Sequence, residues 1–189
     1  KQVIQYVDPF DFSAIRTVLG AATLFVVLLV LRRPLGLQQV RQVALLGVLQ
    51  TGAFTALIQW ALVAGGAGKT AVLVYTMPFW VVPMAWFVLG ERVRGMQWVA
   101  NAIAACGLVL VLEPWAMGGS AFSNLLAVAG GVTWAAASVQ AKRMRRAHDF
   151  DLLSLTAWQM LFGAIALCVL ALLHPSRPID PTPYFWGAL

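Results

Sequence analysis

Six long stretches without Asp, Glu, Lys or Arg dominate this sequence of 189 residues. They cover residues 17–31, 42–68, 70–90, 95–112, 114–141 and 152–176. An α-helix needs about 20 apolar residues to cross a hydrocarbon core about 30 Å thick. Five of the stretches are near or above that length, and the first reaches it when residues 13–16 are added. The chain is therefore predicted to cross a membrane about six times.

The spanning segments are predicted to be helices. Lipid offers no water to the backbone, so only helices and closed barrels span it. Barrel strands alternate in polarity over about ten residues, whereas these stretches are longer and do not alternate. Hydrophobic residues make up 61% of the chain and charged residues only 11%, against about 25% charged in soluble domains. We predict an all-α polytopic membrane protein and exclude a soluble enzyme, a nucleic-acid binder and a disordered chain.

The basic residues predict how the helices are oriented. Residues 32–41, 91–94 and 142–151 contain nine of the 13 Lys and Arg residues, and these segments connect alternate pairs of spans. The opposite connections contain only Lys1, Lys69 and Arg177. Positive connections stay in the cytoplasm, so we expect the three basic segments to be cytoplasmic and the protein to lie in the inner membrane. Lipid is then an expected partner, and nucleic acid is not.

The chain ends and the cysteines add two smaller expectations. The sequence starts at Lys1 and stops at Leu189 within an apolar stretch, so we expect a piece of a longer membrane protein. Cys106 and Cys168 each lie inside an apolar run, which is typical of small packing residues. We therefore expect no disulfide, no metal site and no cofactor; the oligomeric state stays open.

An internal repeat is visible when the chain is shifted by 143 residues. Among the positions that are then identical are Asp8 with Asp151 and Gly20 with Gly163. The first and sixth spans would enter the membrane from opposite sides. Repeats that return in opposite orientation are typical of secondary transporters, so we expect these two helices to run antiparallel.

Residues 69–112 contain a series of motifs in a specific order. Small residues lead into a helix with a central proline, followed by Gly-Glu-Arg, a glutamine and a glycine in the next span. These positions are Ala71, Pro78, Gly90, Glu91, Arg92, Gln97 and Gly107. Together with Asp8, Pro9 and Arg16 upstream, and Trp158, Gln159 and Gly163 downstream, the pattern resembles the EamA domain of the drug/metabolite transporter superfamily.

The resemblance implies a fold of ten helices in two inverted repeats of five. This chain would then correspond to helices two to seven and the start of the eighth. Residues 1–113 would form most of the first repeat, without its first helix, and residues 114–189 the start of the second. The implied function is a secondary transporter or permease that moves small metabolites, amino acids or similar, by alternating access.

Polar and aromatic residues within the spans are the candidates for a substrate site. Such residues are expected to face the helix bundle or a wet cavity rather than lipid. Packing between helices and interfacial aromatic belts are the alternative explanation. The candidate substrate-binding residues are Gln59, Trp60, Tyr75, Phe79, Trp134, Ser138 and Gln159.

Four further residues are candidates for gating or structural roles. Pro78 and Pro83 fall inside the third span, where proline removes a hydrogen bond and kinks a helix. Glu91 stands at the expected cytoplasmic end of that span beside Arg92, so a salt bridge there could close an inner gate. Arg16 lies about one turn inside the first span, from which its long side chain can extend to the interface.

Two short motifs suggest other classes of protein. GGAGKT at residues 65–70 lacks the first glycine of a phosphate-binding loop, because that position is Val63. The sequence HDFD at residues 148–151 could hold Mg²⁺ in a membrane transferase, but Asp151 also suits the N-cap of the next helix, with Ser154 three residues on. No nucleophile–base pair is evident, so we expect no enzymatic activity. The alternatives are a transferase that uses HDFD and a membrane scaffold that transports nothing.

Overall fold

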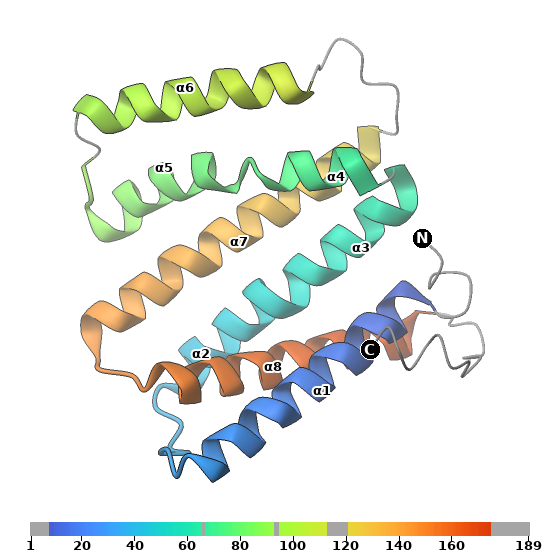
Figure 1. The fold of residues 1–189 in the computed structure, drawn as a ribbon, viewed down its shortest axis with the longest axis vertical. Coiled ribbons are helices and arrows are strands. Elements are labelled where there is room, and N and C mark those ends of the chain that lie inside the picture. The colour runs from blue at the N-terminus through green and yellow to red at the C-terminus, as the bar shows by residue number, and fades with distance from the viewer. Residues whose placement is uncertain (1–7, 66, 93–94, 113–120, 175–189) are drawn as a thin grey trace. The chain divides into compact units, whose positions relative to one another are not determined.

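The computed structural model describes residues 8–65, 67–92, 95–112 and 121–174, and every regular element in these ranges is a helix (Figure 1). The elements are α1 (Pro9–Val30), α2 (Val40–Gly47), the π-helix η2 (Val48–Ala53), α3 (Phe54–Gly65), α4 (Ala67–Val74), α5 (Met77–Leu89), α6 (Gly95–Leu112), α7 (Ala121–Ala147) and α8 (Leu152–Leu173). Five helical segments are long and apolar enough to cross a membrane, and a shorter apolar helix covers Gly95–Leu110. The prediction of an all-α membrane protein that crosses the bilayer several times is confirmed.

The helix boundaries follow local capping chemistry. α1 begins at Pro9, several residues before the charge-free run, because the Asp8 carboxylate accepts a hydrogen bond from the Phe10 amide at 2.9 Å. Asp151 caps α8 in the same way, accepting from the Ser154 amide at 2.9 Å, as predicted. Asp8 and Asp151 are paired positions of the 143-residue repeat. Each of them starts a helix of 22 residues.

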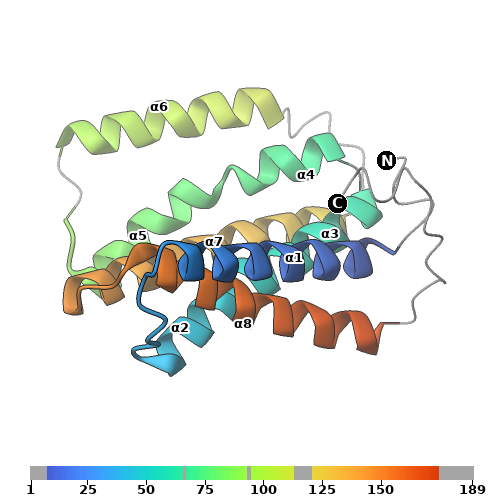
Figure 2. The same cartoon turned by 60° about the horizontal axis from the view of Figure 1, so that its bottom comes forward.

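The described residues form two compact units, one made of the segments up to Ala56 and from His148 onward, and the other of Leu57–Ala147. In the first unit, α1 and α8 lie side by side (Figures 1 and 2). Phe10, at the start of α1, contacts His174 beyond the end of α8, with ring centroids 5.1 Å apart. Phe25, near the end of α1, contacts Trp158 in the first half of α8 at 5.1 Å. The two helices therefore run antiparallel, which confirms the expectation from the repeat.

The same unit contains a seam of glycines where α2 and η2 cross α8. A Cβ atom added to Gly163 would overlap the Thr51 side chain and lie 2.8 Å from the Gly47 carbonyl oxygen. A Cβ atom on Gly47 would overlap the Gln159 carbonyl, and one on Gly52 would lie 2.9 Å from the Ala166 Cβ. Small residues of this kind let two membrane helices approach backbone to backbone. This crossing holds α8 against the second membrane-spanning helix.

In the second unit, α7 packs against α4 and α5. The buried core between α3, α4 and α7 consists of Ala61, Leu73 and Ala127. The buried Ser123 hydroxyl donates to the Ala61 carbonyl at 2.8 Å, which satisfies a polar group inside this apolar packing. Gly131 of α7 lies beside the junction of α4 and α5, while the far ends of α5 and α7 meet at Glu91 and Lys142. These contacts make α5 and α7 parallel.

Candidate functional site

The third span is broken in the middle. α4 ends at Val74, a turn occupies Tyr75 and Thr76, and α5 begins at Met77. Pro78 causes the break, because it has no N–H to donate to the Val74 carbonyl one turn earlier. The Thr76 hydroxyl instead donates to the Leu73 carbonyl at 2.7 Å. The predicted proline kink is thus a turn of two residues between two helical segments of one membrane-spanning stretch.

Gly131 of α7 packs directly on this break. A Cβ atom added there would lie 3.2 Å from the Thr76 hydroxyl oxygen and 3.4 Å from the Val74 carbonyl oxygen. The exposed backbone of the break therefore abuts a helix surface without a side chain. Broken helices in transporters expose backbone groups of this kind beside substrate and ion sites.

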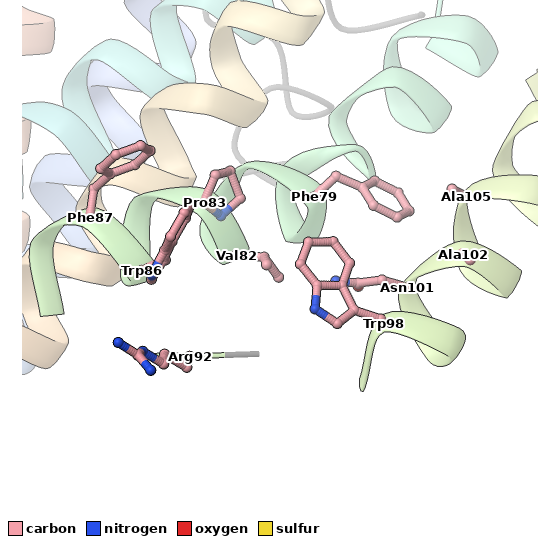
Figure 3. A pocket seen from close by; sticks show the side chains of 10 residues that line it. All are labelled: Phe79, Val82, Pro83, Trp86, Phe87, Arg92, Trp98, Asn101, Ala102 and Ala105. Carbon is pink, nitrogen blue, oxygen red and sulfur yellow. The ribbon is translucent and has the colours of Figure 1, made fainter. Parts of the chain in front are cut away.

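A cavity of about 780 Å³ lies between α5 and α6 (Figure 3). Its lining combines four aromatic rings with aliphatic side chains, one guanidinium group and one amide. The lining residues are Phe79, Val82, Pro83, Trp86, Phe87, Arg92, Trp98, Asn101, Ala102 and Ala105. A volume of this size and a mostly apolar wall with a few polar groups are typical of small-molecule sites.

The polar groups of the cavity define its chemistry. Arg92 can bind a carboxylate or phosphate through two parallel hydrogen bonds. Asn101 can both donate and accept a hydrogen bond. A neighbouring cavity of about 710 Å³ shares Val82, Arg92 and Asn101 and is also lined by Glu91 and Gln97. The arrangement suits a ligand with an apolar or aromatic body and an anionic group.

The predicted site residues lie on several helices, and one of them lines this cavity. Phe79 of α5 is part of the wall. Ser138 on α7 donates back to the Trp134 carbonyl at 2.9 Å, and Tyr75 stands 65% exposed at the helix break. Gln59 and Trp60 are on α3, and Gln159 is on α8 in the other unit. A pocket formed by all seven residues stays a prediction.

Trp86, Trp98 and Asn101 were not among the predicted site residues. Asn101 and Gln97 are the two amides of an otherwise apolar stretch, and Trp98 precedes Asn101 by three residues, which places Trp98 and Asn101 on one face of α6. Asn101 together with Trp98 was the signal that could have identified this face. Arg92 appeared in the sequence only as part of the Gly-Glu-Arg motif.

Glu91 is held at the end of α5 by local backbone geometry. Gly90 ends the helix in a left-handed conformation with φ 65°, which glycine adopts without steric cost. The Glu91 carboxylate then pairs with Lys142 of α7 at 2.6 Å and also with Arg146. Arg146 donates in addition to the Leu89 carbonyl at 3.3 Å. The predicted salt bridge of Glu91 therefore reaches across to α7.

Arg16, the other predicted gating residue, lies exposed on α1, and its guanidinium carbon is 6.0 Å from the Phe12 ring centroid. This is a contact within one helix, at i and i+4. A gating role of Arg16 stays a prediction.

The carboxyl of Glu91 is expected to titrate at an unusually low pH. The hydrogen bond from Lys142 is the main cause that lowers its pKa, and the charges of Lys142 and Arg146 add to it. A lowered pKa means that the pairing is fully present above the ordinary pKa of a glutamate and is lost as pH falls through the lowered value. Carbon-13 NMR of labelled carboxyl groups should show this low midpoint. Lys142→Met should raise the midpoint and Arg143→Gln should leave it unchanged; equal midpoints in all three proteins would contradict the assignment.

The HDFD motif serves the structure of the first unit. One oxygen of Asp151 caps α8, and the other accepts from Arg33 at 3.4 Å. His148 contacts the Gln39 side chain at 2.7 Å. A cavity of about 180 Å³ beside the motif includes Asp149 and Asp151. Because both Asp151 oxygens are engaged, this arrangement gives no support to a transferase that binds Mg²⁺ there.

Comparison with known proteins gives a consistent result. Residues 1–113 and 121–189 match the family described as "EamA-like transporter family". The chain is 25% identical over 193 residues to the "uncharacterized transporter YoaV" of Bacillus subtilis, covering 98% of this chain and 65% of that protein. It is 27% identical over 182 residues to an "uncharacterized transporter" of Clostridium kluyveri, covering 91% of this chain and 58% of that protein.

A third relative is named for its substrate. The chain is 32% identical over 104 residues to a "riboflavin transporter" of Rhizobium johnstonii, covering 52% of this chain and 33% of that protein. The chain thus spans less than two thirds of the length of these relatives. No solved structure matches the chain.

Proposed function

This chain belongs to the EamA-like transporter family, and we propose that it forms part of a secondary transporter that moves small metabolites by alternating access. The observation that carries the proposal is the broken helix α4–α5 beside the cavity between α5 and α6. In secondary transporters, discontinuous helices place backbone dipoles at the substrate site. Here Pro78, at the break, directly precedes Phe79 of the cavity wall.

The substrate class follows from the wall of the cavity. Phe79, Trp86 and Trp98 offer flat apolar surfaces, and Arg92 offers a cation. We propose amino acids or similar metabolites, and among them those with an aromatic or apolar body and a carboxylate or phosphate. The riboflavin transporter among the relatives is named for a flat heteroaromatic substrate, which matches the aromatic body of this class but not its anionic group.

The proposal is tested by uptake into liposomes that contain the intact protein. Aromatic amino acids, aliphatic amino acids, flavins and sugars are offered in turn, each as radiolabelled compound. We expect uptake of an aromatic or apolar anion, and a loss of affinity in the cavity variants Trp98→Ala and Arg92→Gln. The control is Phe122→Ala, which removes an exposed aromatic side chain of α7 outside the cavity lining. Uptake of sugars only, or equal affinity in all variants, would refute this substrate class.

The internal repeat suggests which parts of the protein move relative to each other during transport. We propose that residues 1–113 belong to one inverted repeat and residues 114–189 to the next, and that the two repeats rock around a fixed site. The pairing of Glu91 with Lys142 joins the ends of α5 and α7. We propose that this contact forms in one access state and breaks in the other.

The sidedness of the membrane helices is part of the proposal and can be measured. In a variant with Cys106 and Cys168 replaced by serine, single cysteines are placed at Gln38, Ala147 and Gly118. We expect the first two to be protected from an impermeant maleimide added outside intact cells, because the basic connections should lie in the cytoplasm of a cell with this protein in its inner membrane. The third, which lies outside the described residues, should react. If the cysteine placed at Gln38 is labelled from outside, the membrane orientation is the opposite of the one expected.

A further inference from the structure

A cluster of cations lies at the end of α7 that meets Glu91. Lys142, Arg145 and Arg146 line a cavity of about 460 Å³, and Arg143 is exposed beside them. The lysine and Arg146 side chains are 53% and 50% exposed even though both pair with Glu91. Two of the four cations pair with the one carboxylate of Glu91, so the cluster keeps a positive charge at neutral pH.

The position of this cluster along α7 is set by the length of the apolar segment. Residues 121–141 of α7 carry no charge, and 21 residues at 1.5 Å each span about 31 Å. This matches the hydrocarbon thickness of a bilayer, about 30 Å. The cavity therefore opens at the depth of the lipid headgroups.

The neighbouring end of α5 offers apolar surface next to the cations. Trp86, Phe87 and Val88 are 55%, 80% and 50% exposed, and they directly precede the Gly90–Glu91 turn that binds Lys142 and Arg146. A free phosphate ion would use only the cations. A phospholipid would use both parts, with its phosphate in the basic cavity and its acyl chains along the exposed apolar residues.

We propose that the cavity of Lys142, Arg145 and Arg146 binds the headgroup of an anionic phospholipid. Arginine forks bind phosphate oxygens in pairs, and basic pockets at the ends of membrane helices recognise anionic headgroups. Arg145 is free to engage the phosphate, since no partner is found for its side chain among the residues that the structure describes. Glu91 competes with the phosphate for Lys142 and Arg146. The basic cavity shares no lining residue with the proposed substrate cavity, although Trp86 and Phe87 also line the latter.

The test is native mass spectrometry of the intact protein in a neutral detergent, titrated with phosphatidylglycerol or phosphatidylcholine. Each basic residue near a membrane surface contributes about 1 kcal/mol to anionic lipid binding, so Arg145→Gln should weaken phosphatidylglycerol binding about fivefold. Arg145→Lys should restore most of it. Glu91→Gln should strengthen binding, because it releases two cations. Arg41→Gln, which removes an exposed charge on α2, is the matched control and should have no effect.

Five outcomes would overturn the proposal. Equal binding of phosphatidylcholine would remove the need for an anionic headgroup. Unchanged binding in Arg145→Gln, or an equal loss in Arg41→Gln, would show that the cavity is not the site. Full displacement of the lipid by millimolar inorganic phosphate would assign the cavity to a free anion. Weaker phosphatidylglycerol binding in both the Arg145→Gln and the Glu91→Gln variant would indicate general damage to this end of α7.

Discussion

Replacing Gly163 with leucine is expected to lower the melting temperature of the intact protein by roughly 5–10 °C. Gly163 lies where α8 crosses η2, and an added Cβ atom would overlap Thr51 and lie 2.8 Å from the Gly47 carbonyl oxygen. These neighbours include backbone, which cannot rotate away as a long side chain can. Overpacking usually costs about 1–3 kcal/mol, and a backbone contact belongs at the upper end of that range.

The matched control is Gly107→Ala in α6, where an added Cβ atom has no neighbour within 4 Å. This variant should keep or slightly raise the melting temperature, because alanine favours helix by about 1 kcal/mol over glycine. The measurement is a thermal melt of purified protein in detergent, followed by tryptophan fluorescence. If the Gly163→Leu variant has the same melting temperature as the wild type, the close crossing of α8 and η2 is wrong.

Replacing Pro78 with alanine is expected to reduce transport at least tenfold without lowering thermal stability. Alanine restores the N–H that can bind the Val74 carbonyl, and a continuous helix then competes with the break. Proline in a helix interior costs about 3 kcal/mol relative to alanine, and every 1.4 kcal/mol is a factor of ten. A loss of transport without a loss of thermal stability would distinguish a functional break from ordinary packing.

The measurement combines substrate uptake in liposomes with a thermal melt of the same preparation. Pro9→Ala is the control, since Pro9 lies in the first turn of α1, where a missing N–H breaks no hydrogen bond of the helix. It should change transport much less than Pro78→Ala. Normal uptake by Pro78→Ala would mean that the break between α4 and α5 has no part in transport.

The membrane-spanning architecture was predictable because it depends on local composition. A charge-free run of sufficient length decides that a segment spans the bilayer, and Asp151 followed by Ser154 decides where α8 begins. The start of α1 was misplaced for the same local reason. The first span was expected from residue 13 onward, whereas the cap at Asp8 starts the helix at Pro9.

The cavity and the ion pairs were less predictable because they depend on contacts far apart in the sequence. The stretch that forms α6 is apolar on nearly all sides, so its pattern does not show which face meets α5. Glu91 meets Lys142 and Arg146 across separations of 51 and 55 residues. The charges next to Glu91 in the sequence suggested Arg92 and Arg94 as partners instead.

The glycine seam also fixes the order of events while the chain is being made. Gly47 and Gly52 pack against α8, whose Gly163 follows Gly52 by 111 residues. At a synthesis rate of about 5–20 residues per second, the second span waits roughly 6–22 s in the membrane before its partner helix leaves the ribosome. During that interval its glycine face is open to lipid or to the insertion machinery. Final assembly of the first unit is therefore a post-insertion step, and slow or stalled translation between α3 and α8 would prolong the exposed state.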